Sequence, residues 1–307
     1  MKIKNLETKT DIFLAPMAGY TDVAFREQCK KYGAGLTTTE MVSAKGLLYD
    51  SEKTKWLLIT SQFEDIKSVQ IFGHEPDVIA KACSNELLKD FDIIDINMGC
   101  PATKIVKNGD GSKLMTNFAL AEQIVKSAVM ATDKPITVKM RLGYDKNVAV
   151  EFAKMLEKAG ASAIAVHGRL ATQGYAGDVD YKSIAEVKKA VSIPVVANGN
   201  IVDEKSYQEV LKITNADAVM IGRAAVGDPY IFARLLKMPV KVDRLKTIKE
   251  QFDLLLKYYT EHFVVTTMRK QLVKYLKDEN VPAGTRLELL RLENAKDVLA
   301  KLEEILK

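Results

Sequence analysis

At 307 residues the chain is longer than an average domain, yet barrels of alternating strands and helices routinely form one domain of roughly 200–250 residues. A hydrophobic content of 47% supports a large core, and the net charge of +5 is compatible with an anionic partner without requiring one. The three cysteines, Cys29, Cys83 and Cys100, lack metal-ligand spacing. They argue against a disulfide framework, and we predict no metal site.

The first eleven residues mix charged side chains with no apolar run, so we do not expect a secretory signal. No apolar stretch approaches the roughly 18 residues that a membrane-spanning helix needs. Because sparse, unpaired cysteines suit a reducing compartment, we expect a cytoplasmic protein with no membrane partner.

Short apolar runs rich in β-branched residues alternate with longer amphipathic segments over residues 1–239. The runs predict strands at about Ile12–Pro16, Leu36–Met41, Ser68–Phe72, Ile93–Asn97, Ile136–Met140, Ala163–His167, Val195–Ala197 and Ala218–Ile221. The segments between them predict helices, among them Val23–Tyr32, Pro76–Lys89, Ala119–Ala131, Val148–Ala159, Ile184–Val191 and Ser206–Ile213.

Eight alternations of strand and helix predict an α/β fold, and eight is the number that closes a (β/α)8 TIM barrel. A doubly wound open sheet is the competing architecture. Polar residues follow nearly every predicted strand, as at Gln70, Asn97 and His167. In a barrel all of these strand ends meet on one face, whereas in an open sheet only those beside the switch point would meet. We therefore predict the barrel.

The pattern changes after Pro239. The segment Val242–Lys307 has no strand-like run, a single glycine, Gly284, and long stretches with helical periodicity. We predict two domains: a catalytic TIM barrel over residues 1–239 and a small all-α domain of about three to five helices over residues 240–307.

Glycine-containing polar turns follow the seventh and eighth predicted strands, as Asn198-Gly199-Asn200 and Gly222-Arg223. Barrels often bind phosphate at these ends through backbone N–H groups, and an arginine adds a charge-assisted hydrogen bond. The glycines would also suit ordinary tight corners. Their occurrence at two consecutive strand ends favours the phosphate site.

Two pairs of charged or polar residues lie at two-residue spacing on other strands. Lys139 lies within an apolar run, where a buried lysine needs a partner, and this partner is either a carboxylate such as Asp95 or an anionic ligand. Arg141 shares its strand face. His167 and Arg169 repeat this spacing on the next strand, and together the four residues favour an anionic ligand at the barrel mouth.

Cys100 follows a glycine, precedes Pro101 and belongs to no periodic face, unlike Cys29 and Cys83, which fit buried helical positions. It therefore lies in a loop at a strand end, where catalytic residues are commonly placed. The residues alone leave open whether its thiol acts as a nucleophile or as a general acid.

In the C-terminal segment, Lys270, Lys274 and Lys277 recur at helical spacing, with Arg269 beside them. Such a run is usually a solvated helix face. Attached to a catalytic barrel, it would also suit the phosphate backbone of a nucleic acid.

These motifs resemble the tRNA-dihydrouridine synthase family, flavin enzymes that reduce uridine in tRNA. The resemblance covers nearly the whole chain and is most specific at the Asn-x-Gly-Cys-Pro and APMAG-x-TD signatures. It runs through Ala15–Asp22, Gln70–Gly73, Asp95–Pro101, Lys139–Gly143, His167–Arg169, Ala197–Ile201 and Met220–Ala225, and the helix around Met268–Lys277 is similar to the tRNA-binding domain of bacterial members.

The resemblance implies FMN as the cofactor and a role for each matching residue. Pro16, Met17 and Ala18 would line the isoalloxazine, Gln70 would hydrogen-bond the ring, and Lys139 would face its N1/O2 edge. Asn198, Gly199, Asn200, Gly222 and Arg223 would hold the phosphate, and His167 would contact the flavin or the uracil. Asn97, Arg141, Arg169, Arg269, Lys270 and Lys274 would bind the substrate.

The resemblance also implies the reaction. NADPH would reduce FMN, and tRNA would bind across the barrel mouth and the helical domain. A uridine of the D-loop would be extruded into the pocket, as base-modifying enzymes require. Hydride would pass from flavin N5 to uracil C6, and Cys100, as the catalytic general acid, would protonate C5. We expect a monomer.

Two departures from the family pattern concern loops near the expected site. Asn200 stands where many members carry aspartate, and Asp110 and Lys113 stand where alanines are usual. Two other functions compete with the synthase: an FMN barrel enzyme acting on a free pyrimidine such as dihydroorotate, and a non-catalytic tRNA-binding protein that retains FMN. Binding of tRNA separates the first from the synthase, and turnover separates the second.

Overall fold

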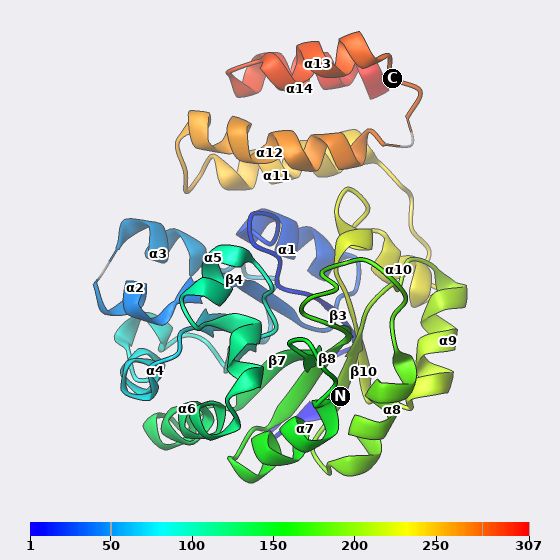
Figure 1. Cartoon of the computed structure of the whole chain (residues 1–307). Helices are drawn as coiled ribbons and strands as arrows, with labels where there is room; N and C mark the ends of the chain where they lie inside the picture. The colour runs from blue at the N-terminus through cyan, green and yellow to red at the C-terminus, as the bar shows by residue number, and fades with distance from the viewer. Residues whose placement is uncertain (50, 278, 307) are drawn as a thin grey trace.

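A computed structural model describes residues 1–49, 51–277 and 279–306 of the chain. Eight parallel strands form a closed barrel in sequence order, with the last strand pairing with the first (Figure 1). They are β3 (Ile12–Leu14), β4 (Thr37–Ser43), β5 (Lys67–Phe72), β6 (Ile93–Met98), β7 (Ile136–Gly143), β8 (Ala163–Leu170), β9 (Val195–Asn198) and β10 (Ala218–Ile221). The predicted TIM barrel is confirmed, and the open sheet is excluded.

Amphipathic helices cover the outside of the barrel (Figure 1). These are α1 (Val23–Lys31), α4 (Pro76–Cys83), α6 (Phe118–Ala131), α7 (Ala149–Lys158), α8 (Tyr181–Ala190) and α9 (Glu204–Thr214). Shorter elements were not predicted, since they span too few turns to show a period: α2 (Ala44–Leu48), α3 (Glu52–Leu57), α5 (Thr103–Lys107), α10 (Ile231–Leu235) and the 3₁₀ turns η2 (Gly111–Thr116) and η3 (Arg223–Ala225).

The single helix predicted over Pro76–Lys89 is wrong. Helix α4 ends at Cys83, and a separate 3₁₀ turn, η1 (Glu86–Leu88), follows. The cause is Asn85, whose side-chain oxygen accepts a hydrogen bond from Leu87 N at 2.9 Å and so starts a new turn. Asparagine favours such capping positions over helix interiors.

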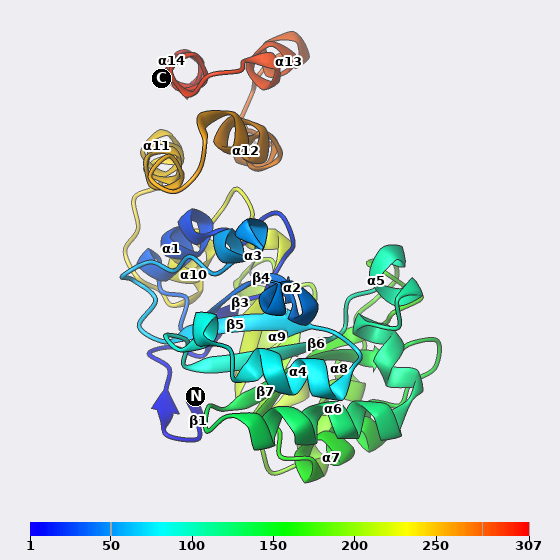
Figure 2. The same ribbon diagram turned by 90° about the vertical axis from the view of Figure 1, so that its left-hand side faces the viewer.

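The barrel interior is filled by side chains that include Phe13, Ile93 and Met220. An N-terminal hairpin, β1 (Lys2–Ile3) and β2 (Leu6–Glu7), adds the buried Ile3 to this cluster. The hairpin lies at the end of the barrel opposite α5 (Figure 2). It was not predicted, because two-residue strands carry no periodic signal. The interior is thus a packed core rather than a pore.

Four helices follow the barrel among the described residues: α11 (Arg244–Leu255), α12 (Glu261–Tyr275), α13 (Ala283–Arg291) and α14 (Ala295–Leu306). They form a separate apolar core that also takes in Val23 and Ala24 of α1. The predicted helical region is confirmed, whereas the boundary between residues 239 and 240 stays a prediction. Asp278 and Lys307 of the predicted domain lie outside the described residues. None of the described helices is long and apolar enough to span a bilayer.

The helical region stacks on α1 and α3, as both views show (Figures 1 and 2). Gln271 of α12 donates to the carboxylate of Asp22 at 2.8 Å, and Tyr259 donates to the carbonyl of Trp56 at 2.9 Å. Asp22 also caps α1 by accepting from Phe25 N at 2.9 Å. These contacts fix α12 against the loop that follows β3.

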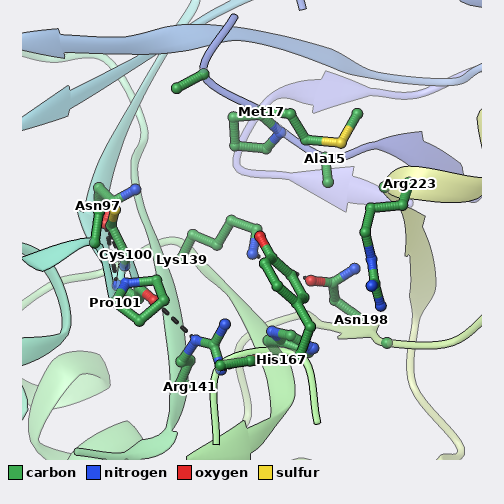
Figure 3. A pocket seen from close by; sticks show the side chains of 18 of the residues that line it. Ala15, Met17, Asn97, Cys100, Pro101, Lys139, Arg141, His167, Asn198 and Arg223 are labelled. Carbon is green, nitrogen blue, oxygen red and sulfur yellow. Dashed lines mark hydrogen bonds between the residues drawn. The ribbon is translucent and has the colours of Figure 1, made fainter. Parts of the chain in front are cut away.

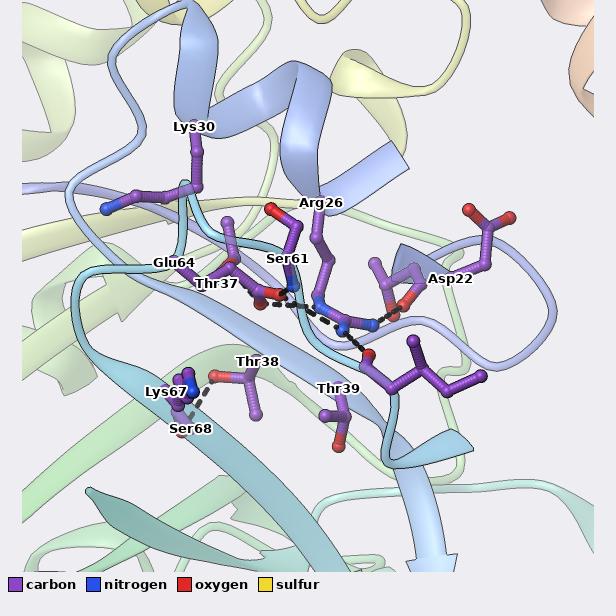
Figure 4. Close-up of polar contacts among 12 residues, drawn as sticks. Asp22, Arg26, Lys30, Thr37, Thr38, Thr39, Ser61, Glu64, Lys67 and Ser68 are labelled. Atoms are coloured by element: carbon purple, nitrogen blue, oxygen red, sulfur yellow. Dashed lines mark hydrogen bonds and ion pairs between the residues drawn. The ribbon is translucent and has the colours of Figure 1, made fainter. Parts of the chain in front are cut away.

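A buried ion pair holds the first strand–helix unit together (Figure 4). Arg26 Nε lies 2.8 Å from Glu64 Oε1, and its guanidinium also donates to the carbonyl of Thr21 at 2.7 Å. Glu64 accepts further bonds from Thr37 Oγ1 at 3.0 Å and from Ser61 N at 2.9 Å. Because every charge in this network is paired or hydrogen-bonded, burial is tolerated and the loop ending at Asp22 is fixed.

Candidate active site

A cavity of about 890 Å³ opens at the carboxyl ends of the barrel strands, where active sites of this fold lie (Figure 3). Side chains from almost every strand or its following loop line it, and Lys274 of α12 adds a side chain from the helical region. Among the lining residues are Pro16, Met17, Ala18, Gln70, Asn97, Cys100, Lys139, Arg141, His167, Asn198, Gly199, Asn200, Gly222 and Arg223. The structure thus brings together most of the residues singled out in the sequence.

Three of the selected residues do not line the cavity. Arg169 is buried and donates to the carbonyl of Gly177 at 2.7 Å. Arg269 donates to the carbonyl of Leu292 at 3.2 Å, within the helical region. Lys270 Nζ lies 5.1 Å from the centre of the Tyr20 ring, beside the loop after β3. Their roles in binding a substrate stay predictions.

A chain of hydrogen bonds orients the amides on β5 and β6. Thr137 Oγ1 donates to Asp95 Oδ1 at 2.6 Å, and Gln70 Nε2 donates to Asp95 Oδ2 at 2.7 Å. Asn97 Nδ2 in turn donates to Gln70 Oε1 at 2.8 Å. Burial raises the pKa of Asp95, against the lowering effect of these donors. Both polar atoms of the Gln70 amide are therefore engaged, which fixes its orientation.

Asn97 shapes the loop that carries Cys100. Its side-chain oxygen accepts hydrogen bonds from Gly99 N at 3.1 Å and from Cys100 N at 2.9 Å. This asparagine turn explains the Asn-x-Gly-Cys spacing, because the side chain reaches backbone amides two and three residues ahead. The thiol of Cys100 is partly exposed, whereas Cys29 and Cys83 are buried in α1 and α4.

Lys139 is partnered by a neutral amide rather than by a carboxylate. Its Nζ donates to Asn198 Oδ1 at 3.1 Å, while both oxygens of Asp95 are already occupied. Burial lowers the pKa of Lys139 to about 8, and the neighbouring Arg141 contributes to the decrease. The positive charge is therefore poorly compensated, and an anionic ligand would stabilise it.

His167 is neutral in this setting. Burial, together with the positive charges of Lys139, Arg141, Arg169 and Arg223, lowers its pKa to about 2. Its Nε2 lies 3.3 Å from Arg169 Nη1, which assigns Nε2 as the acceptor and places the proton on Nδ1. Burial is the larger cause, and the four cations around the ring add to it because they oppose a further positive charge.

Arg141 ties together two loops at the cavity mouth. Its Nε donates to the carbonyl of Gly99 at 3.0 Å, and its Nη1 donates to the carbonyls of Leu170 and Gly174, both at 2.8 Å. Burial lowers its pKa. The sequence predicted contact with the substrate, and the structure adds a role in holding the loop before Cys100.

Tyr175, which no motif in the sequence singled out, is 58% exposed and lines the cavity. Its ring centre lies 4.4 Å from Arg223 Cζ and 5.7 Å from Arg141 Cζ. It lies between Gly174 and Gly177, both in the left-handed region, with φ of 58° and 70°. An aromatic residue between two glycines after a strand was the available signal.

At the carboxyl end of β9, the backbone packs closely against the side chain of Val179, in the loop after β8. A Cβ on Gly199, at φ 138°, would lie 2.8 Å from Val179 Cγ1, and Asn200 adopts a left-handed φ of 48°. Arg223 extends from the neighbouring strand end to the same cavity. Only glycine fits at position 199 without displacing Val179.

Comparison with known proteins places this chain in a family. A family model described as dihydrouridine synthase matches residues 13–307. Two relatives named tRNA-dihydrouridine synthase B are similar: that of Vibrio parahaemolyticus at 41% identity, covering 91% of this chain and 90% of its own, and that of Vibrio vulnificus at 39%, covering 99% and 98%.

A solved structure, that of a variant of NCR from Zymomonas mobilis, shares only the fold. It has a TM-score of 0.57 at 18% identity, over 80% of this chain and 93% of its own. The family match over nearly the whole chain is the stronger finding. The chain belongs to the dihydrouridine synthase family, as its motifs indicated, and is a flavin-dependent oxidoreductase.

Proposed function

We propose that this protein is a tRNA-dihydrouridine synthase that uses FMN and NADPH to reduce uridine to 5,6-dihydrouridine in the D-loop of tRNA. The observation that carries the proposal is that Cys100 opens into the same cavity as Lys139, Arg141 and His167. A thiol beside poorly compensated positive charge suits proton donation to a substrate that lies against an anionic cofactor. The names of the relatives support the substrate.

The residues present fit FMN. Pro16, Met17 and Ala18 give the cavity an apolar wall, and Lys139 and Asn198 face it from the other strands (Figure 3). The volume of about 890 Å³ lies within the range of roughly 300–1,000 Å³ typical of cofactor sites. Arg223 and the backbone around Gly199 would hold the phosphate. When bound, the flavin supplies the hydride that reduces the uracil ring.

Cys100 would complete the reduction by giving its Sγ proton to uracil C5 as C6 accepts hydride. The C5=C6 double bond becomes single, and a thiolate remains that takes up a proton from water. Hydride addition at C6 leaves C5 in need of a proton and of no bond to sulfur. This requirement favours the general acid over the nucleophile that the sequence left open.

The helical region would bind tRNA beside the cavity. Lys274 of α12 lines the cavity itself, and Lys270 lies one helical turn earlier on the same face. An RNA backbone along this face would present an extruded uridine to Cys100. The contact between Asp22 and Gln271 supports this arrangement, because it holds α12 against the cavity loop.

The test is turnover on unmodified tRNA. Purified protein is incubated with FMN, unmodified tRNA transcript and either NADPH or NADH, and the digested RNA is examined for dihydrouridine by mass spectrometry. We expect product in the D-loop, with NADPH the better donor. Reduction of FMN by NADPH without any dihydrouridine, either in the transcript or in tRNA from cells that lack this modification, would overturn the proposed substrate. Free pyrimidines would then be tested.

A further inference from the structure

The loop after Cys100 returns to contact the cysteine. Ser112 donates to the carbonyl of Cys100 twice, from its backbone N at 3.0 Å and from its Oγ at 2.9 Å. Gly111 has a left-handed φ of 61°, and a Cβ there would lie 2.8 Å from the Cys100 carbonyl oxygen. The position of residues 110–112 therefore determines where the backbone of Cys100 lies.

Asp110 begins this returning segment and is held from outside it. Its side chain is only 8% exposed, and its Oδ1 lies 2.8 Å from His74 Nδ1. His74 follows β5, the strand that carries Gln70, so the contact joins the loops of two neighbouring strands. The imidazole also packs over Gly109, where a Cβ would lie 3.7 Å from the ring. A hydrogen bond between a ring N–H and a buried carboxylate is of the stronger, charge-assisted kind.

We propose that Asp110 and His74 are positioning residues for Cys100. Their contact fixes the position of residues 109–112, and these residues in turn fix the position of the Cys100 thiol in the cavity. The inference rests on the proposed function, in which Cys100 donates a proton. It also gives a purpose to Asp110, which stands where the family usually has alanine. An aspartate here can be held by His74, whereas an alanine cannot.

The proposal predicts a loss in proton delivery rather than in binding. We expect Asp110→Ala to lower kcat with tRNA about tenfold, the change that loss of one charged hydrogen bond produces. The KM for tRNA and the affinity for FMN should stay within about twofold. The solvent deuterium isotope effect on kcat should rise, because protonation by Cys100 becomes slower. Asp110→Asn keeps a side-chain acceptor for His74 and should recover most of the activity.

Hydrogen exchange gives a readout that does not depend on turnover. In Asp110→Ala the amides of residues 109–113, including Ser112 N, should exchange about tenfold faster, while those of α7 stay unchanged. His74→Ala should reproduce both effects, and the double variant should be no worse than either single variant, since both remove the same interaction. Asp133→Ala, an exposed carboxylate at the opposite end of the barrel, is the matched control.

Wild-type kcat and wild-type exchange in Asp110→Ala, or additive losses in the double variant, would overturn the proposal. Failure of the proposed function looks different: the wild-type protein would then make no dihydrouridine, and exchange at residues 109–113 would still report on the pairing of Asp110 with His74.

Discussion

Positive charge occurs in two very different settings in this molecule. In the cavity, Lys139 and Arg141 lie on the rigid strand β7, and burial lowers the pKa of both. At the carboxyl end of α12, Lys274 and Lys277 are exposed. A desolvated charge discriminates strongly between a ligand that neutralises it and one that does not, whereas an exposed charge acts at longer range and is screened by salt. The barrel cavity is therefore suited to selecting a small anionic ligand, and the helical region is suited to attracting a large polyanion.

The largest effect should come from Cys100, which lines the cavity. Cys100→Ala should retain the flavin and lose uridine reduction by about 100-fold or more, the usual contribution of general acid catalysis. Dihydrouridine formation and the flavin absorbance measure the two properties separately. Cys83→Ala, a buried cysteine of α4, should keep full turnover. A C100A variant with near wild-type activity would remove Cys100 from the mechanism.

Lys139→Met tests whether burial of a cavity charge costs stability. Because the folded-state pKa of about 8 lies below the ordinary value of 10.5, the unfolded chain holds a proton that the folded chain releases between these pH values. Stability of the flavin-free wild type should therefore rise as the pH increases through this window.

The methionine variant lacks this dependence. At pH 7 its free energy of unfolding should exceed that of the flavin-free wild type by about 2 kcal/mol, and this gain should fade towards pH 10. The gain is smaller than a fully dehydrated site would give. Thermal unfolding at several pH values measures the difference, and a gain independent of pH would contradict this account. With FMN present the order should reverse, because the ligand compensates the lysine.

The exposed lysines Lys274 and Lys277 should affect binding of a polyanion rather than stability. Lys274→Ala with Lys277→Ala should weaken tRNA binding about tenfold at low salt. The slope of log K against log salt concentration should become shallower by about one unit for each phosphate that is no longer neutralised. The double variant should leave the affinity for FMN unchanged. Lys296→Ala, on the outer helix α14, is the control. Equal losses in the control would show that only net charge matters.

The smallest effect on binding should come from Arg269. Its guanidinium already donates to the Leu292 carbonyl, and its Nε is buried without a partner. Arg269→Ala should lower the free energy of unfolding by about 1 kcal/mol and change the tRNA affinity less than Lys274→Ala does. Chemical denaturation and filter binding report the two quantities. If the loss in the free energy of tRNA binding exceeded the loss in the free energy of unfolding, Arg269 would be a residue that binds RNA.

The sequence predicted all eight barrel strands and the helical region, because alternating apolar runs and amphipathic periods are local signals. It also gathered most of the cavity residues, since the carboxyl ends of barrel strands must converge. Lys139 and Arg141, two residues apart on β7, necessarily share a face.

What the sequence could not supply were contacts between distant loops. No motif in the sequence singles out His74, yet it lies 2.8 Å from Asp110, 36 positions along the chain. Tyr175 carried no periodic pattern, and its place between Arg141 and Arg223 depends on how its loop folds back. Arg269 and Lys274 looked equivalent in the sequence, but only one lines the cavity.

The small N-terminal hairpin has a consequence for the order of events in catalysis. Ile3 and the barrel interior are packed at one end, and the cavity lies at the other end, where Lys274 of α12 and Tyr175 line it. In the proposed function, a dinucleotide reductant and a folded RNA would both reach the cavity from that end, so we expect each to leave before the other binds. The protein would then keep its reducing equivalents from the departure of the reductant until the RNA binds.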